Sequence, residues 1–311
     1  MSDDERYMRR CLQLAGNGVH YAKPNPMVGA VIVCDGRIIG EGYHVRCGEG
    51  HAEVNAFASV RPEDEHLLPQ STIYVSLEPC AHYGKTPPCA ELIIRKGVRR
   101  TVVGCVDPFA RVQGRGIAMI RDAGIEVTVG VLEEECRRLN CRFFTYHQHH
   151  RPYILLKWAQ TADGFLDDNG RAMAISTPFT RMLVHKLRAE NDAILVGRIT
   201  AERDNPALNV RYWDGDDPLR IVLGGNMNID EVITDMYDRG IQSLIVEGGA
   251  RTHASFIGRG LWDEIRVETS PQIVGGGTAA PALPPNSVET RRECYDSNVI
   301  VWYRRKTKTD V

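Results

Sequence analysis

The chain has 311 residues, of which 43% are hydrophobic and 25% are charged, and its formal net charge is −2. That length predicts two domains, and the composition excludes a disordered chain. With 38 basic against 40 acidic residues, there is no basic excess for binding nucleic acid. No apolar run is long enough to cross a bilayer, and the acidic N-terminus lacks the apolar core of a secretory signal. We therefore expect a cytoplasmic protein without a membrane or nucleic-acid partner.

The first half of the chain alternates between strand and helix patterns. Ser2 and Glu5 form a capping box for a helix that Gly16 and Gly18 close, and Asp35–Gly36 is a hairpin turn signal. The other expected elements are, in chain order, strands at Val28–Cys34 and Arg37–Tyr43, a helix at His51–Val60, a strand at Thr72–Ser76, a helix at Glu91–Lys96, a strand at Thr101–Cys105, a helix at Ile117–Ala123, a strand at Glu126–Val129 and a long helix at Glu133–Tyr146. Such alternation predicts an α/β layered sheet.

A polar stretch, His147–Pro152, follows, and Pro152 disfavours helix in the residue before it. We interpret this stretch as a linker and predict domains at 1–147 and 152–311. Its histidines lack regular ligand spacing, which favours a linker over a metal site. The second half predicts another α/β series, with strands at Tyr153–Trp158, Ala193–Val196, Leu219–Leu223, Ser243–Val246, Glu264–Thr269 and Val299–Tyr303, and with helices that run from Thr177 towards Ala189, over Glu231–Arg239 and from about Thr252.

One group of residues in the first half indicates zinc chemistry. Catalytic zinc takes three protein ligands and keeps a fourth position for water, and His51, Cys80 and Cys89 supply one imidazole and two thiolates. Glu53, on the first turn of the expected helix, can take a proton from that water and return it to a substrate ring. His-x-Glu followed by Pro-Cys is the pattern of nucleobase deaminases, although eight residues rather than two separate these cysteines. We expect one zinc ion per chain.

Two plainer interpretations of the same residues stay open. One is a structural zinc site, which a fourth ligand such as His82 or His44 would close. The other is a set of core thiols with a surface histidine, because cysteine is often a small buried hydrophobe. Disulfides are disfavoured, since the nine cysteines are an odd number without an export signal. The position of His-x-Glu after a hairpin, and of Pro-Cys after the next strand, favours the catalytic interpretation.

Several stretches carry a family resemblance. In the first half, Pro24–Val33, Gly40–His44, His51–Val54 and Leu77–Cys89 resemble the bifunctional riboflavin biosynthesis family RibD, whose mark is the long insert between the cysteine ligands. The second half resembles the reductase of that family in Lys157–Ala159, Ala162–Gly164, Leu187–Ala189, Asp192–Gly197, Asp204–Leu208, Arg220–Leu223 and Val246–Ala250. The resemblance implies an N-terminal cytidine-deaminase-like α/β/α layered domain and a C-terminal dihydrofolate-reductase-like α/β domain.

The resemblance also implies two reactions on a small molecule, a pyrimidine ribosyl phosphate. The first domain would deaminate 2,5-diamino-6-ribosylamino-4(3H)-pyrimidinone 5′-phosphate, and the second would reduce the ribosyl chain to ribityl with NADPH. Carried over residue by residue, the zinc ligands are His51, Cys80 and Cys89, the proton carrier is Glu53, the substrate contacts are Asn25, His44, Lys85, Arg188, Leu208, Arg211 and Glu247, and the cofactor contacts are Ala159, Thr200, Asp204, Gly248 and Gly249. The glycine pair between a strand and a helix would let backbone amides approach a cofactor phosphate.

The second half departs from the family pattern at three places. Gly224–Gly225 stands where the family usually has Asp after the Arg-Ile-Val-Leu strand, and Ala172 and Ala174 stand where some members have Ser and Trp. A stretch as long as a strand–helix–strand unit is absent between Ile229 and Glu231. We therefore expect a shortened domain with a shorter central sheet. An alternative function follows: a deaminase whose degenerate C-terminal domain serves substrate binding or oligomerisation. We also expect a homo-oligomer.

Two further hypotheses come from other classes of protein. A deaminase of nucleic-acid bases would need a basic rim and aromatic side chains for the flipped base, which the balanced charge disfavours. The other hypothesis is a zinc-binding interaction protein without enzymatic activity, for which replacement of Glu53 by Gln should change nothing.

Overall fold

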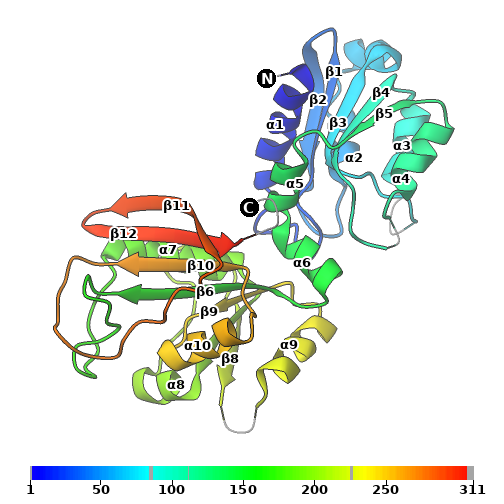
Figure 1. The fold of residues 1–311 in the computed structure, drawn as a ribbon. Helices are drawn as coiled ribbons and strands as arrows, with labels where there is room; N and C mark the ends of the chain where they lie inside the picture. Colours follow the sequence, from blue (N-terminus) through cyan, green and yellow to red (C-terminus); the bar gives the residue numbers. More distant parts are fainter. Residues whose placement is uncertain (1, 84–86, 111, 225–226, 307–311) are drawn as a thin grey trace. The chain divides into compact units, whose positions relative to one another are not determined.

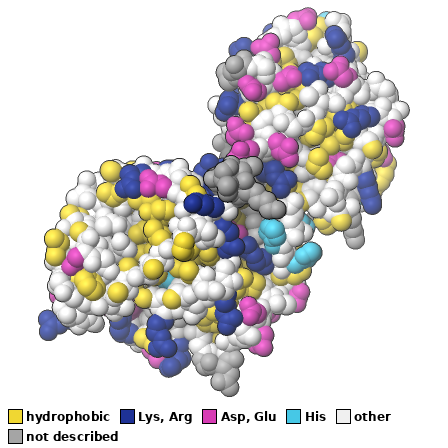
Figure 2. Space-filling model, in the orientation of Figure 1, with side chains coloured by type: hydrophobic (Ala, Val, Ile, Leu, Met, Phe, Trp, Pro, Cys, Tyr) yellow, Lys and Arg dark blue, Asp and Glu magenta, His cyan; other side chains and the backbone are white. Residues whose placement is uncertain are grey.

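The computed structural model describes residues 2–83, 87–110, 112–224 and 227–306. The chain divides into two compact units, Met1–His149 and His150–Val311, each with its own mixed sheet (Figure 1). Within the described ranges, no helix has both the length and the apolar character that a bilayer crossing requires. On the face drawn in Figure 2, basic and acidic side chains are interspersed over each unit.

The first unit is built on five strands: β1 (Gly29–Cys34), β2 (Arg37–Tyr43), β3 (Thr72–Leu77), β4 (Arg100–Cys105) and β5 (Glu126–Val129). Their spatial order is β2-β1-β3-β4-β5. β1 is antiparallel to β2 and β3, whereas β3, β4 and β5 are parallel. Because parallel strands end at the same edge of a sheet, the loops after β3 and β4 leave it side by side.

The helices of the first unit are α1 (Asp3–Gly16), α2 (Ala52–Ala58), the 3-10 helix η1 (Pro62–Gln70), α3 (Cys89–Lys96), α4 (Arg115–Asp122), α5 (Glu133–Leu139) and α6 (Cys141–His149). They cover both faces of the sheet, because neighbouring residues of a strand point to opposite sides. Ala30 and Ile32 of β1 belong to the core with α2, α3 and α4, while Val31 and Val33 belong to the core with α1, α5 and α6. The sheet is therefore the middle layer of an α/β/α sandwich (Figure 1).

The second unit has seven strands: β6 (Tyr153–Gln160), β7 (Ala193–Gly197), β8 (Leu219–Leu223), β9 (Ser243–Val246), β10 (Glu264–Thr269), β11 (Ser287–Tyr295) and β12 (Asn298–Arg305). Their order is β11-β12-β10-β6-β9-β7-β8. Neighbours from β10 to β8 are parallel, and β12 is antiparallel to both β10 and β11. This unit too is therefore dominated by a parallel sheet with an antiparallel edge.

Helices also flank both faces of the second sheet; they are α7 (Pro178–Glu190), α8 (Arg198–Asp204), α9 (Ile229–Asp238) and α10 (Ala250–Gly258). Ile154 and Leu156 of β6 pack in the core that includes α9 and α10, whereas Leu155 packs in the core that includes Leu187 of α7. The near-continuous apolar run of β6 reflects this burial on both faces.

Most of the expected elements are present, and two expectations need correction. The helix expected at Glu133–Tyr146 is in fact two helices, because the buried Asn140 follows α5 and its amide pairs with both backbone groups of Met27 at 2.8 Å. The expected linker is helical at its start, since α6 continues to His149. The sequence patterns do not predict η1, α8 or β11; β11 lies at a sheet edge and is mostly polar, so it shows no apolar alternation.

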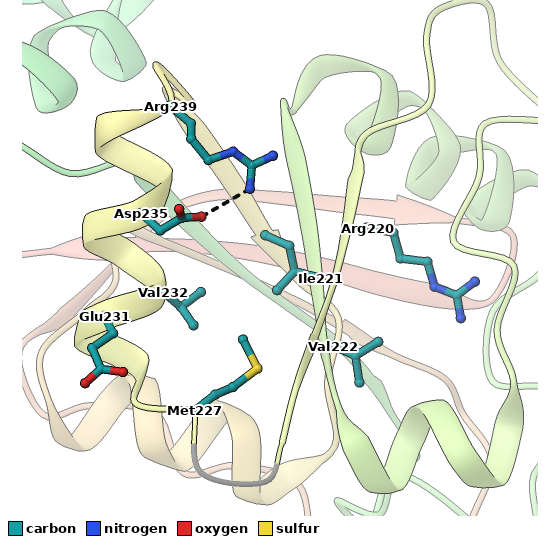
Figure 3. A pocket seen from close by; sticks show the side chains of 8 residues that line it. All are labelled: Arg220, Ile221, Val222, Met227, Glu231, Val232, Asp235 and Arg239. Carbon is teal, nitrogen blue, oxygen red and sulfur yellow. Dashed lines mark hydrogen bonds and ion pairs between the residues drawn. The ribbon is translucent and has the colours of Figure 1, made fainter.

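β8 is the last strand of the second sheet, so one of its edges has no neighbour in the described part of the chain. Its apolar side chains Leu219 and Val222 are correspondingly exposed. A pocket of about 460 Å³ lies between β8 and α9 (Figure 3), lined by Arg220, Ile221, Val222, Met227, Glu231, Val232, Asp235 and Arg239. Among its described lining residues are none of those expected to bind substrate or cofactor.

Candidate metal centre and reductase pocket

His51, Cys80 and Cys89 come together where elements of the first unit begin or end. His51 is the N-cap of α2, Cys80 lies shortly after β3, and Cys89 is the first residue of α3. The Nδ1 atom of His51 is 3.6 Å from the Sγ atom of Cys80 and 3.4 Å from that of Cys89, and the three ligand atoms all lie within 4.8 Å of one another. One imidazole and two thiolates at this spacing fit a tetrahedral zinc ion with one open position.

The surroundings favour the thiolate that a metal ion needs at Cys80, whereas the hydrogen bond with Cys80 and burial raise the pKa of Cys89. A hydrogen bond with Cys89 and the neighbouring His51 imidazole lower the pKa of Cys80 to about 4. The Sγ atom of Cys80 also accepts the backbone N–H of Cys89 at 3.3 Å. The hydrogen bond with Cys80 in turn raises the pKa of His51. Cys80 is thus held in the ionised form that binds zinc.

Glu53 lies in the first turn of α2, beside the ligand atoms. Its side chain is buried, and burial raises the pKa of Glu53 to about 7. Its carboxyl group hydrogen-bonds the side chain of Cys89. A carboxyl group with such a pKa, next to the open position of a metal site, can accept and return a proton near neutral pH.

Among the residues that the structure describes, the metal-binding group has three members and no fourth ligand. His82, one candidate for closing the site, lies with its ring 6.1 Å from the ring of Phe109. His44, the other candidate, uses both ring nitrogens in hydrogen bonds to different groups. This geometry is that of an open catalytic metal site rather than of a closed structural one.

Asn25 and His44, two expected substrate contacts, lie together next to the ligand His51. The ring centre of His44 is 5.4 Å from that of His51. Its Nδ1 atom is 3.2 Å from the carbonyl oxygen of Gly50, and its Nε2 atom is 3.1 Å from the Nδ2 atom of Asn25. The carbonyl partner fits a proton on Nδ1, which leaves Nε2 to accept from the Asn25 amide, and burial lowers the pKa of His44. Lys85, the third expected contact of this unit, lies outside the described residues.

Glu78, which the sequence analysis did not single out, ties the ligand loop to α4. A Cβ atom on Gly116 would lie 1.9 Å from the carbonyl oxygen of Pro79, so the first turn of α4 packs directly on the backbone that leads to Cys80. The buried carboxylate of Glu78 accepts backbone N–H groups at 2.9–3.3 Å from Asp107, Gly114, Gly116 and Ile117. The signal in the sequence is a glutamate at the end of a buried strand, because a buried carboxylate requires donors.

A pocket of about 340 Å³ in the second unit brings together three of the predicted reductase residues: Ala159 on β6, Arg188 on α7 and Arg211. Its other lining residues are Lys157, Leu166, Met173, Ala174, Ile175, Ser176, Arg181, Val184 and His185. Four lining side chains are cationic, so the pocket attracts anions. The sequence analysis named neither Arg181 nor His185, although their helical spacing from Arg188 is a signal that finds them.

Glu247, which directly follows β9, is held by two cations beside this pocket. Its carboxylate oxygens accept the Nε and Nη2 atoms of Arg188 at 2.9 Å each, and the Nζ atom of Lys157 is 3.8 Å away. Burial opposes ionisation here, but the charges of Lys157 and Arg188 prevail and lower the pKa of Glu247 to about 2. The structure thus pairs Arg188 with Glu247, two of the expected substrate contacts.

Arg188→Met should lower the free energy of unfolding by about 3–5 kcal/mol, because it leaves the buried Glu247 carboxylate without its bidentate partner. Urea denaturation of the full chain, followed by fluorescence, measures this. The matched control is Lys186→Met on the same helix: Lys186 is half-buried and its Nζ atom is 4.0 Å from Glu190, a weak ion pair, so we expect a change of at most about 1 kcal/mol. Equal effects of the two substitutions would contradict the assignment.

The ion pair between Arg188 and Glu247 also predicts that the free energy of unfolding depends on pH. The pKa of Glu247 is lower in the folded chain than its unfolded value of about 4.3. Its contribution to stability is therefore fully present above that value and is lost as the pH falls towards 2. The difference in unfolding free energy between wild type and a Glu247→Gln variant should shrink over this range, and a constant difference would contradict the pairing.

The remaining predicted reductase residues lie on α8, in the segment after it and at the start of α10. Gly249 is the N-cap of α10, and a Cβ atom there would lie 3.4 Å from the Oγ1 atom of Thr200; the structure thus brings Thr200 next to Gly249. A Cβ atom on Gly248 would lie 2.7 Å from a side-chain atom of the following helix, so only glycine fits there. Asp204 ends α8, and Leu208 is buried with a positive φ of 54°. Neither is among the described residues that line the pocket.

Family models match both units. Residues 1–105 match the cytidine and deoxycytidylate deaminase zinc-binding region. Residues 152–232 and 222–300 match the RibD C-terminal domain in two pieces that overlap at 222–232. Residues 222–232 are matched in both pieces. We expect such an overlap where the residues that connect the two pieces in other members of the family are absent from this chain. The match to the reductase domain also disfavours a chain that carries a deaminase alone.

Known relatives cover nearly the whole chain. The riboflavin biosynthesis protein RibD of Aquifex aeolicus is 39% identical over 92% of this chain and 92% of its own length, and that of Actinobacillus pleuropneumoniae is 34% identical over 92% and 88%. The crystal structure of a diaminohydroxyphosphoribosylaminopyrimidine deaminase/5-amino-6-(5-phosphoribosylamino)uracil reductase from Thermotoga maritima matches with a TM-score of 0.90 and 34% identity, covering 97% of this chain and 99% of its own. Over both of its units, the chain belongs to the RibD family of riboflavin biosynthesis proteins.

Proposed function

We propose that this chain catalyses two consecutive steps of riboflavin biosynthesis. The first unit deaminates 2,5-diamino-6-ribosylamino-4(3H)-pyrimidinone 5′-phosphate by zinc-dependent hydrolysis, and the second reduces the ribosyl chain of the product to ribityl with NADPH. The name of the Thermotoga maritima protein, which joins a deaminase and a reductase of such compounds, supports both steps. The observation that carries the proposal is the three-member ligand set with the buried Glu53 beside it.

In the first unit, we assign the zinc ligands to His51, Cys80 and Cys89. Bound zinc lowers the pKa of a water molecule and so supplies the nucleophile for deamination. Glu53 would take one proton from that water and pass it to a ring nitrogen, and would then pass the second proton, from the added hydroxyl, to the amino group that leaves as ammonia. Asn25, His44 and Lys85 are the proposed substrate contacts, as the family resemblance implies.

Removal of zinc should abolish the first reaction and spare the second. After dialysis against a chelator, we expect ammonia release to fall to background and to recover with one equivalent of Zn²⁺ per chain. NADPH oxidation on separately supplied aminouracil ribosyl phosphate should not change, because the group placed to hold a metal ion among the described residues lies in the first unit. Ammonia release by protein shown to be metal-free would contradict the assignment.

In the second unit, we propose that Arg188, Leu208, Arg211 and Glu247 bind the sugar phosphate and that Ala159, Thr200, Asp204, Gly248 and Gly249 bind NADPH. The glycine pair at the start of α10 supports a cofactor phosphate there, because backbone N–H groups at a helix N-terminus can approach it closely. Hydride transfer requires chiefly that cofactor and substrate be aligned, so no acid–base pair is needed. A fluorescence titration with NADPH tests whether the shortened unit binds the cofactor.

We also propose a cytoplasmic homo-oligomer that acts on a small molecule. The nearly balanced charge, −2 over the chain, supports a small-molecule substrate over a nucleic acid. Light scattering on the purified chain should give a multiple of 34.8 kDa, and a monomer at micromolar concentration would contradict the oligomer.

A further inference from the structure

One face of α7 lines the pocket of the second unit with cationic and imidazole side chains. Arg181, His185 and Arg188 are spaced four and then three residues apart, which places them on one side of the helix. All three line the pocket. Arg211, from the segment between α8 and β8, lines it as well. The pocket therefore receives three arginines from two separate segments.

These arginines differ in whether a carboxylate neutralises them. Arg188 shares the buried Glu247 with Lys157. Arg181 and Arg211, in contrast, form no ion pair with a carboxylate in the part of the chain that the structure describes, and both are exposed. Lys157 and Arg188 thus share one carboxylate, whereas Arg181 and Arg211 have none among the described residues.

The backbone of Arg211 is held in place by the same helix face. The Nδ1 atom of His185 accepts the backbone N–H of Arg211 at 3.1 Å. The imidazole is buried, its ring centre is 4.8 Å from that of Tyr212, and burial lowers the pKa of His185. The guanidinium group of Arg211 lies 5.0 Å from the ring centre of Tyr212, and its Nη1 atom donates to the Oδ1 atom of Asn209 at 2.7 Å. Arg211 is therefore positioned before any ligand arrives.

We propose that Arg181 and Arg211 together bind a phosphate monoester, and that Arg181 sets the preference of the second unit for phosphorylated over dephosphorylated substrate. The proposal rests on the proposed reductase function, whose substrate carries a 5′-phosphate. The planar guanidinium fork matches phosphate oxygens, and a dianion compensates two cations that have no carboxylate. In this proposal, the uncharged part of the substrate contacts the other charged side chains, Lys157, Arg188 and Glu247.

Arg181→Gln tests this inference, with Lys186→Gln as the matched control. Lys186 is a cation on the same helix but pairs with Glu190 and lies 5.3 Å from the ring centre of Trp213. For NADPH oxidation, Arg181→Gln should raise KM for the aminouracil ribosyl phosphate by about 10- to 100-fold and leave kcat nearly unchanged. KM for the phosphatase-treated substrate should not change, and the control should behave as wild type for both substrates.

Calorimetric titration with ribose 5-phosphate and with ribose measures the same contact without turnover. Wild type should bind ribose 5-phosphate more tightly than ribose, and Arg181→Gln should remove most of that difference. If wild type oxidises NADPH but Arg181→Gln changes neither KM nor the affinity for ribose 5-phosphate, the inference is overturned and the proposed function stands. If wild type does not oxidise NADPH, the proposed function fails, and the titration alone decides: weaker binding by Arg181→Gln upholds the phosphate contact, and equal binding overturns it.

Discussion

Replacement of Glu53 by Gln should reduce ammonia release by about 10²- to 10⁴-fold while the protein keeps one zinc ion per chain. The amide has nearly the shape of the carboxylate but cannot hold the proton that must pass from water to the ring. The ligand atoms of His51, Cys80 and Cys89 are untouched, so metal content should not change. Ammonia release under saturating substrate and zinc content by elemental analysis are the two measurements.

The control for this substitution is Glu49→Gln, close in the chain and also acidic. Glu49 is exposed and lies 4.0 Å from Arg46, so its loss should leave both turnover and zinc content at wild-type values. If Glu53→Gln kept turnover within about threefold of wild type, Glu53 would have no catalytic part and its assignment as the proton carrier would be wrong.

Cys89→Ala should remove zinc and, with it, deamination. The substitution leaves one imidazole and one thiolate, and loss of an outer-shell partner alone already weakens metal affinity about 10- to 100-fold. We therefore expect a loss of zinc affinity of more than about 100-fold and ammonia release at background. Competition with a chromogenic chelator measures the affinity.

Cys34→Ala is the matched control, because Cys34 is also a buried thiol of the first unit but lies on β1 in the apolar core. It should cost stability and leave zinc affinity unchanged. Unaltered zinc affinity in Cys89→Ala, or equal losses in both variants, would contradict the assignment of the ligands.

Sequence alone predicts which side chains come together as a potential metal-binding group, because few residue types can bind zinc and their spacing is visible in the chain. The Nδ1 and Sγ atoms of His51, Cys80 and Cys89 are indeed gathered within 4.8 Å. It also predicts α1, because the capping box of Ser2 and Glu5 is a local signal that the structure reproduces with both hydrogen bonds.

Local sequence patterns do not predict features that depend on contacts between residues far apart in the chain. The break between α5 and α6 comes from Asn140, whose amide pairs with Met27, 113 residues earlier. Glu78 accepts from backbone groups 29 to 39 residues later in the chain, and backbone groups leave no mark in the sequence. Helical spacing from Arg188 is the one local signal for Arg181, and only the folded chain shows that Arg181 lines the same pocket as Arg211, which comes from another segment.

The central claim is that one chain carries both activities. The most direct test supplies zinc-loaded protein with the diaminopyrimidine ribosyl phosphate and NADPH and measures ammonia release and NADPH oxidation in the same reaction. We predict one ammonia released and one NADPH oxidised per substrate, with NADPH oxidation lagging behind ammonia release. Ammonia release without NADPH oxidation would contradict the claim and leave a deaminase whose C-terminal unit has another use.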